Sequence, residues 1–102
     1  MWIHTVYFWT HEGTPPAAIE QLISDCNAYL GKIPTVKQLW AGKPAPTNRD
    51  VVDKSYQVGL TVVLADSPAH DVYQIHELHL EFIARNKAIW KRVQVYDFVT
   101  PQ

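Results

Sequence analysis

The sequence has little that is typical of a secreted, membrane or nucleic-acid-binding protein. Cys26 is its only cysteine, so no disulfide can form within the chain. Nine basic and ten acidic residues leave a formal charge of −1 without a dense basic patch, which argues against nucleic acid as a partner. No apolar run approaches the ~18 residues of a membrane-spanning helix, and the first residues lack the pattern of a secretory signal. We therefore expect a cytoplasmic protein with no membrane partner.

Short motifs that bind phosphate groups or support hydrolysis are also missing. None of the four glycines belongs to the glycine-rich pattern of a nucleotide site or to the nucleophile elbow of a hydrolase. The run His76-Glu77-Leu78-His79 is one residue short of the zinc motif in which two histidines stand four residues apart. The sequence therefore predicts neither a metal site nor a cofactor.

A first helix is the most clearly marked element. Thr14 followed by Pro15 and Pro16 predicts its start, because threonine is a common N-cap and proline fits the first turn. Gly31 is placed to end it. Apolar residues recur at intervals of three and four along this segment, which predicts one buried stripe. The stripe consists of Ile19, Leu22, Ile23, Cys26, Leu30 and Ile33.

The remaining segments alternate between strand and helix patterns. Strands are predicted at residues 2–10, 35–42, 55–65 and 92–99, a short helical turn at 67–75, and a longer helix at 77–91. The inner side of the longer helix is expected to carry Leu78, Leu80, Phe82, Ile83, Ile89 and Trp90. This order predicts one α+β domain over residues 1–102, with a two-layer, ferredoxin-like βαββαβ fold.

Both faces of the predicted sheet carry apolar side chains. On the first strand, His4, Val6 and Phe8 point to one side, while Tyr7 and Trp9 point to the other. Two helices can cover only one face, and a large exposed apolar patch usually marks an interface. We therefore predict a homodimer that forms through the free face of the sheet.

Polar groups able to carry chemistry are concentrated in one short run. Tyr73, His76 and His79 stand three residues apart, so a helix would keep them close together. His4 lies on the strand face that we expect to be buried, and the fold could bring it near Tyr73 or His79. Imidazole exchanges protons near neutral pH, and a tyrosine hydroxyl can donate to a developing oxyanion. An equally good interpretation of His4 is a core histidine whose nitrogens are hydrogen-bonded.

Four segments, taken in order, resemble the stress-responsive dimeric α/β-barrel domain family over nearly the whole chain. They are Ile3-His4-Thr5-Val6, then Ile33-Pro34-Thr35-Val36-Lys37 leading to Gly42, then Tyr73-Gln74-Ile75-His76-Glu77-Leu78-His79, and finally Val95-Tyr96-Asp97-Phe98. The resemblance implies a ferredoxin-like fold whose sheets pair into a barrel, which agrees with the dimer predicted from the sheet.

The same resemblance implies a set of site residues. Plant polyketide cyclases of this family perform an intramolecular aldol condensation, and their catalytic residues would fall at His79, the general base, and Tyr73, which holds the carbonyl oxygen. A further pocket histidine of those enzymes falls at about Val58 here. The expected substrate-binding residues are His4, Val6, Phe8, Val58, His76 and Phe82.

These observations leave three functions open. The favoured one is a protein that binds a small apolar ligand in a pocket between helices and sheet. The alternatives are a cofactor-independent cyclase or related lyase, and a cofactor-free monooxygenase of the antibiotic-biosynthesis type. A cavity of about 300 Å³ or more that touches both Tyr73 and His79 would support binding or catalysis. The loop at residues 43–54 is either a lid or a plain connector.

Overall fold

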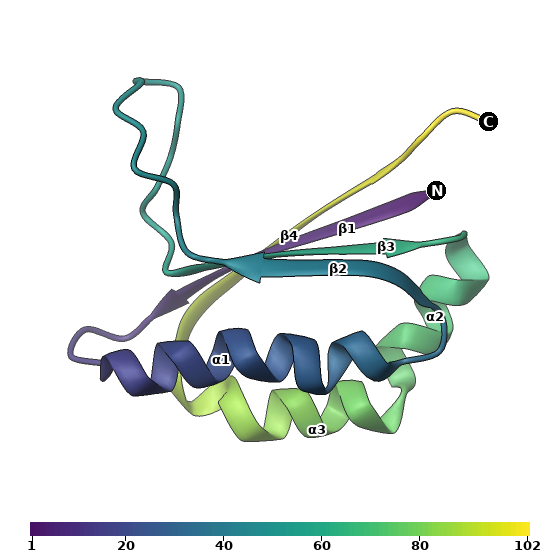
Figure 1. Cartoon of the computed structure of the whole chain (residues 1–102), viewed down its shortest axis with the longest axis horizontal. Coiled ribbons are helices and arrows are strands. Elements are labelled where there is room, and N and C mark those ends of the chain that lie inside the picture. The colour runs from purple at the N-terminus through teal and green to yellow at the C-terminus, as the bar shows by residue number, and fades with distance from the viewer.

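The computed structural model describes residues 1–102 as a four-stranded antiparallel sheet with helices on one side (Figure 1). The strand order is β2-β3-β1-β4, so β1 and β3 are central while β2 and β4 form the edges. The strands are β1 (Trp2–Thr10), β2 (Val36–Gly42), β3 (Val58–Leu64) and β4 (Trp90–Val99). The helices are α1 (Pro16–Ala28), α2 (Ser67–Ile75) and α3 (Glu77–Asn86), with 3-10 turns η1 (Leu30–Lys32) and η2 (Lys87–Ile89). The ferredoxin-like βαββαβ prediction is thus confirmed.

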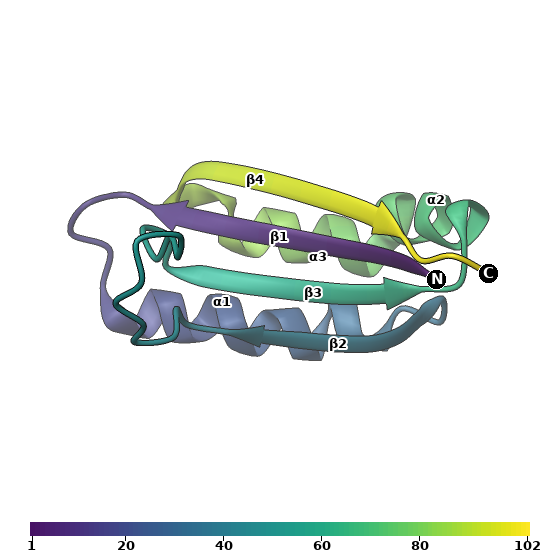
Figure 2. The same ribbon diagram turned by 90° about the horizontal axis from the view of Figure 1, so that it is seen from above.

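The two long helices cover different halves of the sheet. Seen from above, α1 lies under the β2–β3 half and α3 under the β1–β4 half (Figure 2). The chain ends meet at one end of the sheet, where the backbone N–H of Thr100 donates to the carbonyl of Met1. None of the helices is long and apolar enough to cross a membrane.

The start and end of α1 differ from the prediction. Pro15, not Thr14, is the N-cap residue, and no side chain caps the helix. Pro16 causes this, because a residue before proline is held extended, and Pro15 has the extended angles φ −61° and ψ 144°. The hydroxyl of Thr14 instead donates to the carbonyl of His11. At the other end, α1 stops at Ala28 and the chain continues as η1, so Gly31 does not end the helix.

The second half of the chain shows three smaller corrections. The predicted helix 77–91 ends at Asn86, and η2 follows. β4 then begins at Trp90, which pairs with Thr10 of β1 and packs its ring against Phe8 and Phe82. Leu80 is 56% exposed and does not lie on the inner side. It stands two residues before the buried Phe82, and two residues turn an α-helix by about 200°. The strand predicted at 55–65 is shorter, running from Val58 to Leu64.

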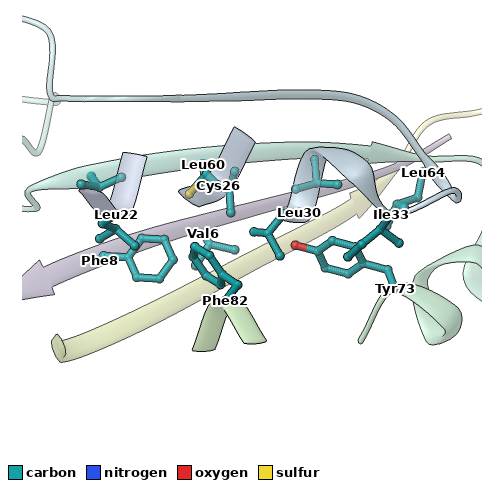
Figure 3. Packing of buried hydrophobic residues seen from close by; sticks show 12 residues of the cluster. Val6, Phe8, Leu22, Cys26, Leu30, Ile33, Leu60, Leu64, Tyr73 and Phe82 are labelled. Atoms are coloured by element: carbon teal, nitrogen blue, oxygen red, sulfur yellow. The ribbon is translucent and has the colours of Figure 1, made fainter. Parts of the chain in front are cut away.

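The core lies between α1, α3 and the lower face of the sheet (Figure 3). Alternate residues of β3 are buried, as a strand with one face against helices requires. The stripe predicted from the sequence enters this core through Leu22 and Cys26 of α1 and Leu30 of η1, all at most 1% exposed. Burial raises the pKa of the Cys26 thiol to about 12, which agrees with its prediction as a small buried hydrophobe.

A polar contact joins α1 to α3 within this layer. The buried carboxylate of Asp25 accepts hydrogen bonds from Arg85 Nε at 2.8 Å and from Asn86 Nδ2 at 3.0 Å. The same amide nitrogen of Asn86 also donates to the carbonyl of Phe82, so it makes two hydrogen bonds within the helix layer. The contact fixes α3, and therefore the residues that α3 presents to the sheet.

The opposite face of the sheet has no helix over it. Trp40, Tyr96 and Phe98 point there and are 58–60% exposed. The loop 43–57 also rises on this side (Figure 1), although Lys43 at its start donates to Glu20 of α1. This loop therefore does not lie over the chain's own helix–sheet layer, and the two interpretations of residues 43–54, a lid or a plain connector, stay predictions.

Candidate functional site

A cavity of about 310 Å³ lies between β1, β4 and the α2–α3 segment. Apolar side chains line most of it, and six polar side chains gather at its α2 end: His4, His70, Tyr73, Gln74, His79 and Asp97. The apolar lining consists of Val6, Phe8, Leu30, Leu60, Phe82, Ile83, Trp90, Val93 and Val95. The cavity thus reaches the volume of about 300 Å³ that was given above as support for binding or catalysis. Tyr73 and His79 both line it.

The register of β1 and β4 brings His4 and Asp97 together. They are directly opposed on the two strands, and His4 Nδ1 lies 2.7 Å from Asp97 Oδ1. Because the carboxylate accepts, the proton sits on Nδ1 and the neutral ring keeps a lone pair on Nε2. Burial lowers the pKa of His4, while the hydrogen bond to Asp97 opposes that shift, so the ring is neutral at pH 7.

Tyr73 and His79 meet across the break between α2 and α3. Their rings lie 4.8 Å apart edge to face, and the Tyr73 ring is 5.6 Å from that of His4. Tyr73 is 1% exposed, and burial raises the pKa of its hydroxyl, which therefore stays protonated. That hydroxyl points towards Leu30 in Figure 3. Burial also lowers the pKa of His79, whose Nδ1 is buried and has no hydrogen-bond partner.

His70 is a cavity residue that the sequence interpretation missed. It is 6% exposed, its ring stacks on Trp2 at 4.6 Å, and it meets the His4 ring at 5.3 Å. The Gln74 amide nitrogen lies 3.0 and 3.1 Å from its two ring nitrogens. His70 stands one helical turn before Tyr73, and this spacing was the available signal.

Asp97 was quoted in the sequence pattern but not assigned a role. It alternates with Val93 and Val95, and a lone carboxylate on the inner face of an apolar strand was the signal for it. His4, His70 and Asp97 each bring one metal-ligating atom within 4.8 Å of the others.

Two expected binding residues do not line the cavity. α2 ends at Ile75, and His76 adopts an extended conformation that interrupts the helix. Its Nδ1 then accepts a hydrogen bond from the backbone N–H of Leu78, which makes His76 the N-cap of α3. Val58 is fully buried on β3 opposite Phe8, in the packed core. His4, Val6, Phe8 and Phe82 do line the cavity, together with Tyr73 and His79.

Comparison with known proteins gives the family. A family profile described as the stress responsive A/B barrel domain, Dabb, matches residues 3–100. The chain belongs to the Dabb family. A search of curated proteins finds no significant match.

Solved structures similar to this Dabb chain share its fold at low identity. A dimeric ferredoxin-like protein of unknown function from Thermobifida fusca has a TM-score of 0.82 at 18% identity, covering 97% of this chain and 90% of that one. Hydroxynitrile lyase from Passiflora edulis has a TM-score of 0.82 at 16% identity, covering 99% and 94%. A mutant form of SnoaB, a cofactor-independent oxygenase from Streptomyces nogalater, has a TM-score of 0.69 at 17% identity, covering 99% and 93%.

Proposed function

We propose that this Dabb protein binds a small, largely apolar carbonyl compound in the cavity between sheet and helices. The observation that carries the proposal is a space of about 310 Å³ with an apolar wall and polar side chains gathered at one end. Ligand pockets commonly combine that size, an apolar lining and a few convergent polar groups. The protonated Tyr73 hydroxyl is a suitable donor for a carbonyl oxygen.

A second candidate function is proton transfer at the carbon next to that carbonyl. His79 is neutral at pH 7 and has an unpartnered ring nitrogen, so it is able to accept a proton. His4, oriented by Asp97, supplies a further basic nitrogen in the same cavity. Tyr73 would stabilise the resulting enolate oxygen. Two structural neighbours, a hydroxynitrile lyase and a cofactor-independent oxygenase, are consistent with this fold accommodating lyase and oxygenase chemistry.

Ligand binding is tested with small carbonyl probes in two-dimensional NMR. An aryl ketone such as phenylacetone is titrated into labelled protein, with the hydrocarbon of the same shape as the comparison. We expect saturable shifts at cavity residues, weakened in Tyr73→Phe and unchanged in His11→Ala, because His11 is exposed outside the cavity. Equal affinity for ketone and hydrocarbon would remove the role of Tyr73, and no saturable shift at cavity residues would refute binding.

Binding and catalysis are separated by isotope exchange. The same ketone is incubated with the protein in D₂O, and deuterium uptake next to the carbonyl is followed by NMR. If the protein enolises its ligand, His79→Ala reduces the exchange rate roughly 10²-fold or more, the usual effect of losing a general base. Exchange no faster than in buffer, together with saturable binding, identifies a binding protein. Exchange that survives the substitution contradicts His79 as the base.

The assembly that we propose is a homodimer formed through the free sheet face. Three large side chains on that face, Trp40, Tyr96 and Phe98, are more than half exposed in the single chain. The Thermobifida fusca neighbour is described as dimeric. Packing two such faces together would bury the patch that one chain leaves in water.

A further inference from the structure

Three side chains of the cavity form a cluster that binding of an apolar ligand does not require. His4 comes from β1, His70 from α2 and Asp97 from β4, and their ligating atoms lie within 4.8 Å of one another. Both histidines are at most 7% exposed, and the carboxylate is about 30% exposed at the edge of the sheet. Three separate elements thus bring these potential ligands together in the lining of one cavity.

The composition of the cluster matches the ligand preferences of a borderline divalent metal ion. Zn²⁺ and its neighbours take imidazole nitrogen and carboxylate oxygen at about 2.0–2.2 Å. A spread of 4.8 Å is therefore wider than a closed site needs, and side-chain rotations would close it. One carboxylate offsets half the charge of the ion, and no lysine or arginine lines the cavity to repel it.

We propose that His4, His70 and Asp97 bind a divalent transition-metal ion of the Zn²⁺ type. Three protein ligands leave at least one coordination position free, as in catalytic zinc sites, whereas structural sites are closed by four. All three residues line the cavity that also holds Tyr73 and His79, so a free position on the ion would be open to that cavity. Gln74 contacts the His70 ring through its amide nitrogen, which donates. With the amide group turned over, its Oε1 would accept the remaining N–H of a metal-bound His70, the usual role of a neighbour to such a histidine.

Metal binding and the hydrogen bond between His4 and Asp97 are alternatives for the same two side chains. Asp97 now accepts the Nδ1 proton of His4 at 2.7 Å, and a metal bound by both residues competes with that contact. The metal site shares its cavity with the ligand proposed above, but the two proposals can be tested separately, because ketone binding can be measured in EDTA. Loss of one activity therefore leaves the other to be judged separately.

The test is titration of untagged, chelator-treated protein with Zn²⁺ by calorimetry. We expect one ion per chain, with affinity at least 10-fold weaker in His70→Phe and in Asp97→Asn. Phenylalanine keeps a ring to stack on Trp2 and removes the ligating nitrogens, while asparagine keeps the shape of the side chain and removes its charge. His11→Phe is the control and binds as the parent protein does.

Two further measurements use the parent protein and so do not depend on the variants folding. Co²⁺ should give visible d–d bands without a thiolate charge-transfer band, because Cys26 is buried in the core away from the cluster. Ni²⁺ should first broaden the NMR signals of residues 4, 70 and 97. No saturable binding at micromolar Zn²⁺, unchanged affinity in His70→Phe, weaker binding in the His11 control, or first broadening elsewhere would each overturn the proposal.

Discussion

Two buried histidines should make the fold less stable as the solution becomes mildly acidic. The pKa values of His4 and His79 are lowered from 6.5 in the folded chain, in both cases mainly by burial. Asp97 and His70 face His4, and His4 and His70 act on His79. Above pH 6.5 both rings are neutral in either state, so their contribution to stability is fully present there. As the pH falls below 6.5, the two histidines take up protons in the unfolded chain before they do so in the folded one. Their contribution to the free energy of unfolding is therefore lost progressively until the pH reaches their pKa values in the folded chain.

The size of the effect follows from the number of protons. Each histidine that is protonated in the unfolded chain and neutral in the folded one lowers the free energy of unfolding by up to about 1.4 kcal/mol per pH unit. The two together give a limit of about 2.7 kcal/mol per pH unit, well above the effect expected of carboxylates, which titrate near pH ~4.

Urea unfolding between pH 7.5 and 5.0, at constant ionic strength and with EDTA present, measures this dependence. His79→Gln should roughly halve the slope, while His11→Gln should leave it unchanged, since that side chain is exposed. Stability that stays level or rises on acidification from pH 7 to 5.5 would refute the reasoning. An unchanged slope in His79→Gln would show that this ring is not one of the two responsible groups.

Three further outcomes are expected. Asn86→Leu should lower the free energy of unfolding by about 1–3 kcal/mol in urea, because the buried carboxylate of Asp25 loses a donor; an unchanged midpoint would contradict this. Cys26 should be inert to a disulfide reagent at pH 8 until the chain is unfolded, and labelling faster than unfolding would show that the thiol is accessible. Tyr96→Lys combined with Phe98→Lys should convert the proposed dimer to a folded monomer in light scattering, and a dimer that survives would place the interface elsewhere.

Much of the fold could be predicted from local patterns. Alternation along β1 predicts that His4, Val6 and Phe8 share the helix-facing side, and the stripe of α1 predicts the burial of Leu22 and Cys26. These follow from periods of two and 3.6 residues, which can be counted directly along the sequence. Boundaries were less accurate where packing decides them, as at the start of β4.

The site was predicted only in part, because much of it depends on contacts between distant segments. Asp97 meets His4, which lies 93 residues away in the sequence, through the register of β1 and β4, and spacing along the chain does not reveal this. His76 was expected beside Tyr73 because helical spacing was applied to residues 73, 76 and 79, although the two predicted helices already left residue 76 between them. At that break His76 becomes the N-cap of α3 and does not line the cavity. The catalytic roles of Tyr73 and His79 and a cytoplasmic location stay predictions.

The position of Asp97 has a consequence for solubility. β4 is an edge strand, and an open edge with free backbone groups invites another strand to add to it. Natural proteins discourage such growth by pointing a charged side chain inward from the edge, where a second sheet would have to bury it. Asp97 does this beside Val93 and Val95, so its loss would leave a purely apolar inner row on that border. We therefore expect the carboxylate that orients an imidazole also to discourage the addition of a strand along this edge.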